Sequence, residues 1–186
     1  AMRMLSYGHD REVLEKLVEF HKHGQLETRS LIVLRHAKAT PRSDWTDGEA
    51  TRPLLPEGEV QAKRLVKLLK SYGPKRLVTS PWRRCLDTVK PYSKSCKRKL
   101  VKRSQITEFK SKKNPKQARQ LVEDVFKDTK HALVCTHRPA LPEVLAAVSQ
   151  HATGEMAEPL RQAAALAPSD FLVVTLSMAT KPTVLD

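Results

Sequence analysis

The segment that decides the fold is Leu31-Ile32-Val33-Leu34-Arg35-His36-Ala37-Lys38, in which an apolar run is followed by an arginine and a histidine. An apolar run of this length, bounded by polar residues, predicts a short buried strand. In open α/β sheets, ligands bind beyond the carboxyl ends of the strands, so we expect Arg35 and His36 at a binding edge. A neutral imidazole is a nucleophile, and a guanidinium is a fixed fork for phosphate oxygens. The segment therefore predicts phosphoryl transfer through a histidine.

Two further segments have the same character, an apolar run that ends in a polar, cationic turn. The first is Thr79-Ser80-Pro81-Trp82-Arg83-Arg84-Cys85-Leu86-Asp87-Thr88, and the second is Leu133-Val134-Cys135-Thr136-His137-Arg138-Pro139. A lone Arg-His pair after a strand is usually structural. Three such segments in this order favour a shared catalytic edge instead.

Together these segments resemble the histidine phosphatase superfamily, which has the phosphoglycerate-mutase-like fold. The residues that carry the resemblance are Arg35-His36-Ala37, then Ser80-Pro81 with Arg84 and Thr88, and finally His137. The stretch from Asp47 to Leu55, followed by Gly58 and Gln61-Ala62, is similar to the short SixA-like branch of that superfamily. The resemblance covers roughly residues 30 to 150 and implies a phosphatase that forms a phosphohistidine.

Strand and helix patterns alternate along the chain. Short apolar runs predict strands at residues 31–33, 77–78, 100–101, 132–135 and 170–176. Apolar residues at helical spacing predict helices at 58–72, 82–91, 115–126 and 141–148, and three prolines predict a loop over 39–57. This alternation predicts the α/β class, a three-layer, histidine-phosphatase-like fold with a mostly parallel central sheet flanked by helices.

Residues 1–28 are predicted to form a helical appendage and linker, and residues 29–186 the phosphatase-like domain. The appendage has an apolar stripe at helical spacing, made by Val13, Leu14, Leu17 and Val18. The stretch Leu5-Ser6-Tyr7-Gly8-His9-Asp10-Arg11 is similar to the tail of a MutT-type Nudix domain. In some bacterial proteins such a domain precedes a histidine phosphatase domain, so this resemblance implies an upstream Nudix domain as a partner.

The composition indicates a reduced, cytoplasmic protein. Cys85, Cys96 and Cys135 are scattered and odd in number, which favours free thiols over a disulfide framework or a zinc site. We expect Cys135, which lies in an apolar run, to be a packing residue, and also Cys85, which stands where the superfamily has a small residue. The chain has no apolar stretch long enough to span a bilayer and no signal-peptide pattern, so we expect no membrane partner.

The formal net charge of +14 predicts an anionic ligand. Much of this charge lies in residues 94–113, where Phe109 is the only aromatic residue. Because single-stranded nucleic acids are held by stacking on aromatic side chains, the stretch does not indicate such a site. We therefore expect a phosphorylated small molecule, a nucleotide, and no specific nucleic acid.

The superfamily resemblance implies a role for each motif residue. His36 would attack phosphorus, while Arg35, Arg84 and His137 hold the phosphoryl oxygens, so that no metal and no cofactor are needed. The spacing from Ser80 favours Arg84 over Arg83.

The leaving oxygen needs a proton, which a carboxylic acid can supply. Glu108 lies in the interval where the superfamily places its acid, with Asp44 and Asp47 as alternatives. The residues predicted to bind the rest of the substrate are Lys38, Arg42, Arg52 and Arg138.

Three functions remain open from the sequence alone. The first is a metal-independent phosphohydrolase acting on nucleotide phosphates or phosphoanhydrides, as part of a nucleotide-sanitising MutT-type protein. The second is a SixA-like protein phosphohistidine phosphatase, and the third is a non-catalytic module that binds anions or nucleic acid. Intact Arg35, His36, Arg84 and His137 weigh against the third.

Overall fold

The computed structural model describes residues 8–24, 26–152, 160, 162–177 and 184–185. In chain order the elements are α1 (Gly8–Lys22), β1 (Thr28–Arg35), the 3-10 turn η2 (Arg42–Asp44), α2 (Pro56–Tyr72), β2 (Arg76–Thr79), α3 (Arg83–Ser95), β3 (Leu100–Lys102), η3 (Ser104–Ile106), α4 (Glu108–Lys113), α5 (Pro115–Phe126), β4 (Ala132–Thr136), η4 (Arg138–Ala140), α6 (Leu141–Ser149), β5 (Phe171–Ser177) and β6 (Val184–Leu185).

The sheet has six strands in the order β3-β2-β4-β1-β5-β6. Strands β3, β2, β4 and β1 run parallel to one another, whereas β5 is antiparallel to both β1 and β6. This arrangement confirms the predicted α/β class with a mostly parallel sheet. In the register of β1 with β4, Arg35 lies opposite Thr136, so the residues that follow these two strands are neighbours.

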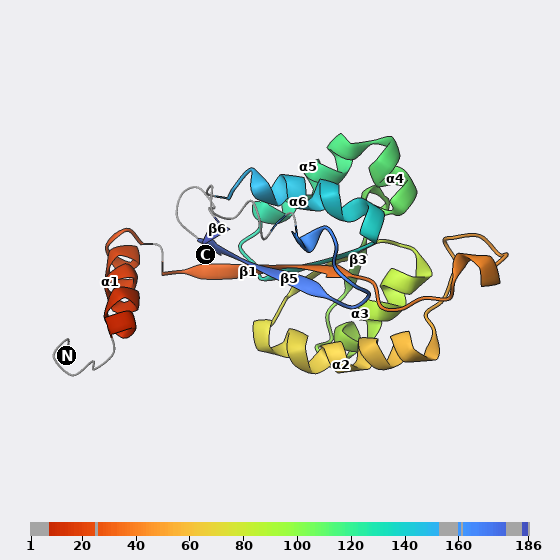
Figure 1. Ribbon diagram of the computed structural model, residues 1–186, viewed down its shortest axis with the longest axis horizontal. Helices are drawn as coiled ribbons and strands as arrows, with labels where there is room; N and C mark the ends of the chain where they lie inside the picture. Colours follow the sequence, from red (N-terminus) through yellow and green to blue (C-terminus); the bar gives the residue numbers. More distant parts are fainter. Residues whose placement is uncertain (1–7, 25, 153–159, 161, 178–183, 186) are drawn as a thin grey trace.

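Helices cover both faces of the sheet, with α2 and α3 on one face and α4, α5 and α6 on the other (Figure 1). Successive side chains of β1 alternate between the two layers. Leu31 and Val33 belong to the core under α5 and α6, while Ile32 and Leu34 belong to the core under α2 and α3. Because both faces are covered, the strand is apolar along its length, which is the pattern the sequence showed.

Two helix boundaries differ from the sequence predictions. Helix α2 begins at Pro56 rather than at Gly58, since proline is well suited to the first turn of a helix. Gly58 is needed for another reason, because a Cβ there would lie 2.0 Å from the Lys38 carbonyl oxygen. Helix α3 continues past Pro91, where a stop was predicted, because Val89 and Tyr92 on either side are buried in the core. The short helix α4 was not predicted.

Helix α1 stands apart from the sheet (Figure 1). Its apolar stripe is exposed, with Val13 47 % and Leu17 44 % accessible. The division of the chain at residue 28 remains a prediction. The stretch that is similar to the tail of a Nudix domain begins with Leu5, Ser6 and Tyr7, which lie outside the described residues. No helix in the described part of the chain is both long and apolar enough to cross a membrane.

Candidate active site

The ends of three adjacent parallel strands bring the three sequence motifs together. The backbone N–H of His36, just after β1, donates to the Thr136 carbonyl at the end of β4 over 3.0 Å. The backbone N–H of Ser80, just after β2, donates to the Cys135 carbonyl over 3.1 Å. The rings of His36 and His137 consequently lie with their centroids 5.3 Å apart. The predicted catalytic edge is therefore assembled by backbone pairing alone.

The tautomer of His36 is fixed by the residue that follows it. The Nδ1 atom lies 2.7 Å from the Ala37 carbonyl oxygen, and because a carbonyl only accepts, Nδ1 must carry the proton. The side chain is 7 % exposed. Burial, opposed in part by the Ala37 hydrogen bond, lowers the pKa of His36 from its ordinary 6.5 to about 3. The Nε2 lone pair is thus available for attack at neutral pH.

We expect His36 to stay neutral on acidification to pH 5. Its folded-state pKa of about 3 lies below the ordinary value, so between about 6.5 and 3 the unfolded chain takes up a proton that the folded protein does not. The free energy of unfolding should accordingly fall as the pH drops through that window. Titration of the His36 ring protons by NMR tests this directly. A transition near pH 6.5 would contradict the burial argument.

Arg84 points into the site, whereas Arg83 points away from it. The Arg84 side chain is 0 % exposed, and its Nη2 donates to a Glu108 carboxylate oxygen over 2.7 Å. The Arg83 side chain is 56 % exposed and pairs with Asp87 one helical turn further along. Successive helix positions diverge by roughly 100°, which separates the two arginines. The predicted choice of Arg84 is consistent with this geometry.

Glu108 lies in the site, at the first residue of α4. One carboxylate oxygen bonds Arg84 and lies 3.5 Å from Nδ1 of His137, and the other bonds Arg42. Thr107 caps the helix by accepting from the Lys110 N–H, which fixes the entry angle of α4. The alternatives Asp44 and Asp47 are exposed in the segment before α2, and in the described part of the chain no ion pair joins either of them to Arg84.

Glu49 is a site residue that the sequence analysis missed. One carboxylate oxygen contacts Arg84 over 3.1 Å and Arg52 over 3.0 Å, and the other contacts Arg42 over 3.0 Å. Its backbone carbonyl accepts a further bond from Arg84 over 2.6 Å. It lies in the loop before α2 that resembles the SixA-like branch, and only the folded path of that loop brings it to the arginines. In this structure two carboxylates therefore hold the guanidinium of Arg84.

Ser80 orients His137, a role that the sequence analysis did not foresee. Its Oγ lies 2.8 Å from Nε2 of His137 and accepts from the Trp82 N–H. Because the Glu108 carboxylate next to Nδ1 needs a donor, we assign the proton of His137 to Nδ1 and the Ser80 hydroxyl proton to the bond with Nε2. Burial, followed by the charge of Arg84, lowers the pKa of His137 well below its ordinary range.

The Ser80→Ala variant should lower kcat by about tenfold to a hundredfold, because a misoriented His137 no longer donates to the phosphoryl oxygen. Ser80→Thr keeps a hydroxyl and should retain more activity than Ser80→Ala. Nitrogen NMR shifts of the His137 ring distinguish orientation from general damage. An unchanged His137 tautomer in Ser80→Ala would rule out this role.

The histidine cluster opens into a cavity of about 330 Å³ that is rich in cations. The cationic side chains that line it are Arg35, Lys38, Arg42, Arg52 and Arg138. The last four of these are the residues predicted to bind the rest of the substrate. Arg35 is anchored by donating to the Leu166 carbonyl over 2.7 Å. The Nε atoms of Arg35 and Arg84 are buried without a hydrogen-bond partner among the described residues. An oxyanion would supply the missing acceptors.

His36, Glu108 and His137 also have the donor types of a metal site. Their ligand atoms lie within 4.8 Å of one another. The surrounding guanidinium groups make this a poor place for a cation, since Arg84 lies 2.7 Å from the Glu108 carboxylate. The charge distribution favours an anion at this position instead.

One protein-family model matches most of the chain. The model of the histidine phosphatase superfamily (branch 1) matches residues 31–175. The 8-oxo-(d)GTP phosphatase of Mycolicibacterium smegmatis is 27 % identical over 145 residues, which is 78 % of this chain and 44 % of that protein. The chain therefore spans less than half the length of this relative.

Solved structures with similar folds carry phosphatase names. A protein histidine phosphatase SixA in complex with tungstate has a TM-score of 0.61 at 19 % identity, over 84 % of this chain and 94 % of that chain. A phosphoserine phosphatase from Entamoeba histolytica has a TM-score of 0.59 at 14 % identity, over 85 % of this chain and 95 % of that one. At these identities the similarity shows the fold. The family model and the mycobacterial relative support a phosphatase in general terms.

Proposed function

The chain belongs to the histidine phosphatase superfamily, and we propose that it hydrolyses nucleotide phosphates or phosphoanhydrides through a phosphohistidine at His36. The observation that carries this proposal is the buried, neutral His36, whose Nδ1–H donates to the Ala37 carbonyl beside a cavity lined by five cationic side chains. A nucleophile with its tautomer fixed and an anion-binding cavity at its side are the two requirements of phosphoryl transfer.

The reaction would proceed in two steps. In the first, Nε2 of His36 attacks phosphorus and the bond from phosphorus to the leaving oxygen breaks. Glu108, which takes up a proton with the substrate as Arg84 turns from it to the phosphoryl group, gives that oxygen its proton. In the second, water attacks the phosphohistidine, Glu108 takes a proton from that water, and inorganic phosphate leaves with His36 restored. Arg35, Arg84 and His137 bind the equatorial oxygens in both steps. Arg84 must exchange a carboxylate partner for the phosphoryl group.

The number of cations favours a substrate with more than one phosphate. Arg35, Arg84 and His137 would together take up the oxygens of a single phosphoryl group. Lys38, Arg42, Arg52 and Arg138 also line the cavity and would meet a second phosphate, as in a nucleoside diphosphate or triphosphate. For this, Lys38 would exchange Glu57, and Arg42 and Arg52 would exchange Glu49, for phosphate oxygens. The nucleotide-phosphatase name of the mycobacterial relative supports the same substrate class. An upstream MutT-type domain stays a prediction.

A substrate panel with a chelator present tests this proposal. We expect release of phosphate from nucleoside diphosphates or triphosphates, with the rate unchanged by EDTA because the phosphoryl charge is met by side chains. Faster turnover of a phosphohistidine protein than of any nucleotide would favour the SixA-like alternative. Tight nucleic-acid binding at physiological salt, without hydrolysis of any substrate, would favour the binding module.

The lysines beside the site should assist substrate capture. Lys110, Lys112 and Lys113 are exposed on α4, the helix that begins with Glu108. Changing all three to glutamine should raise KM by about threefold to tenfold at low salt with little change in kcat, because the local anion concentration falls. Steady-state kinetics at two salt concentrations measures this.

The matched control changes Lys63, Lys67 and Lys70, which are equally exposed on α2. It removes the same charge from another surface and should leave KM within about twofold at both salt concentrations. If the two triple variants behave alike, the overall charge and not the α4 surface attracts the substrate.

A further inference from the structure

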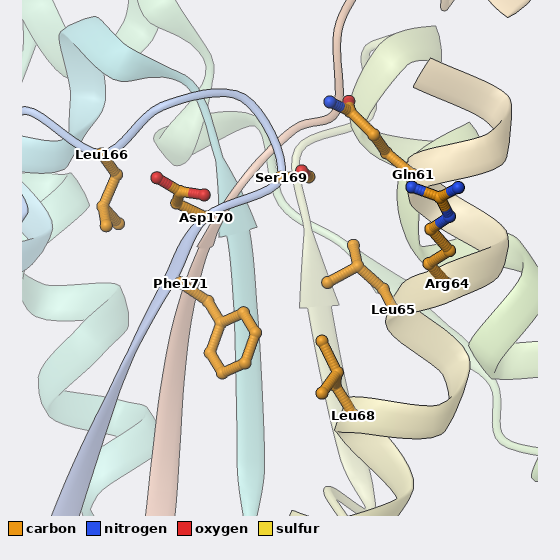
Figure 2. Close-up of a pocket in the computed structure, with 8 residues that line it drawn as sticks. All are labelled: Gln61, Arg64, Leu65, Leu68, Leu166, Ser169, Asp170 and Phe171. Carbon is orange, nitrogen blue, oxygen red and sulfur yellow. The ribbon is translucent and has the colours of Figure 1, made fainter. Parts of the chain in front are cut away.

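A second cavity, of about 500 Å³, lies between helix α2 and the segment that leads into strand β5 (Figure 2). Leu65, Leu68 and Phe171 give it an apolar side, while its polar groups include those of Gln61 and Arg64. In Figure 2 the arrowheads of the neighbouring parallel strands mark one end of the cavity, and the polar head groups of Gln61 and Arg64 lie at that end. The three apolar side chains lie at the opposite end. The polar end therefore faces the same edge of the sheet as His36.

This cavity and the catalytic cavity share a wall. Pro168 lines the catalytic cavity, and the next residue, Ser169, lines the second one. Ser169 has a φ of 71°, so the backbone turns sharply between the two. The Ser169 N–H donates to the His36 carbonyl over 3.2 Å. On the other side, the Gln61 side-chain oxygen accepts from the Lys38 N–H over 2.9 Å.

The lining has the chemistry of a site for a flat heteroaromatic group. The ring of Phe171 with the two leucines offers an apolar surface, and the Arg64 guanidinium offers donors. Within the described residues, Arg64 has no ion-pair or hydrogen-bond partner, so its donors are available. Among the described residues the Asp170 carboxylate accepts from the Ala167 N–H over 3.2 Å and retains capacity as an acceptor. A nucleobase combines an apolar face with donors and acceptors at its edge.

We infer that this cavity binds the base of the nucleotide whose phosphate reacts at His36, an inference that rests on the proposed function. The phosphates would lie across the rim formed by Lys38 and Pro168, with the base against Phe171. A volume of about 500 Å³ lies in the range of small-molecule sites and leaves ample room for a base. A lipid chain would leave the donors of Arg64 and the spare acceptor capacity of Asp170 unused, and a bare sugar would leave the apolar side uncovered.

The test fills the cavity from a position that tolerates a larger side chain. Leu68 is 52 % exposed on α2, so Leu68→Trp should occupy the cavity without disturbing the core. Val60, 44 % exposed on the same helix and outside the cavity lining, gives the matched control Val60→Trp. Each variant of the full chain is assayed with a nucleoside diphosphate and with inorganic tripolyphosphate, which has no base. Circular dichroism checks that both variants are folded.

Leu68→Trp should raise KM for the nucleoside diphosphate by about tenfold or more, the loss expected for one stacking contact. KM for tripolyphosphate should stay within about twofold, and Val60→Trp should change neither. Equal effects on the two substrates, or no effect on either, would overturn the base site while leaving nucleotide hydrolysis intact.

Calorimetric binding of the same two compounds separates this inference from the proposed function. If the chain hydrolyses neither compound, the proposed function fails, and the dissociation constants then decide about the cavity. Weaker binding of the nucleotide alone in Leu68→Trp would still support a base site. Nucleotide binding that is absent, or insensitive to Leu68→Trp, would overturn it.

Discussion

Replacing His36 by alanine should reduce phosphate release by roughly 10⁴-fold or more, because the covalent route loses its only nucleophile. The remaining cations can still bind the substrate, so KM should change far less than kcat. Among the described residues the His36 side chain makes one hydrogen bond, to Ala37, and the strands around it are paired through the backbone. We therefore expect the variant to fold, which thermal unfolding checks. The measurement is steady-state phosphate release from the best nucleotide of the panel.

His131→Ala is the control for this variant. That histidine precedes β4 at the opposite end of the strand from His137 and contacts Ser30. Its replacement should alter stability more than turnover. Substantial turnover by His36→Ala, with His131→Ala equally active, would mean that phosphoryl transfer uses a different nucleophile.

Replacing Arg84 by alanine should lower kcat by about 10²- to 10³-fold, the loss expected for removing one preorganised group that stabilises transition-state charge. The Arg84 guanidinium is the fully buried cation of the site, and it holds both Glu49 and Glu108. Its removal also leaves two carboxylates without this partner, so the melting temperature should fall. Arg84→Lys keeps the charge and loses the planar fork of donors. Comparing kcat of the two variants therefore separates the loss caused by the missing charge from the loss caused by the missing geometry.

Arg83→Ala is the matched control for Arg84→Ala. It removes an exposed ion pair with Asp87, of a kind worth about 0.3–0.5 kcal/mol, and should leave kcat within about twofold. Equal losses in the two alanine variants, measured in the same assay, would show that the assignment of Arg84 to the phosphoryl group is wrong.

The sequence predicts the catalytic edge because parallel strands end on the same side of a sheet. The apolar runs before His36 and His137 are the buried strands β1 and β4, which pair in parallel. Once two such strands are adjacent and in register, the residues after them must meet. This argument requires only local patterns, so the fold class and the placement of the two histidines follow from the sequence.

The contacts that tune these residues depend on loop paths, which no local pattern encodes. Glu49 reaches Arg84 only because of how the chain runs between β1 and α2. The bonds from His36 to the Ala37 carbonyl and from Ser80 to His137 involve backbone angles and rotamers at strand ends. Helix α3 also continues through Pro91 because tertiary packing outweighs the local breaker.

The proposed phosphohistidine is tested most directly by trapping it. The chain is mixed with a nucleotide labelled at its terminal phosphate, quenched within one turnover in denaturant at alkaline pH, and digested for mass spectrometry. We expect one phosphoryl group on the peptide that contains His36, and none on the corresponding peptide of His36→Ala. Rapid turnover by the wild-type chain with no label on His36, or with the label on another residue, would contradict the mechanism.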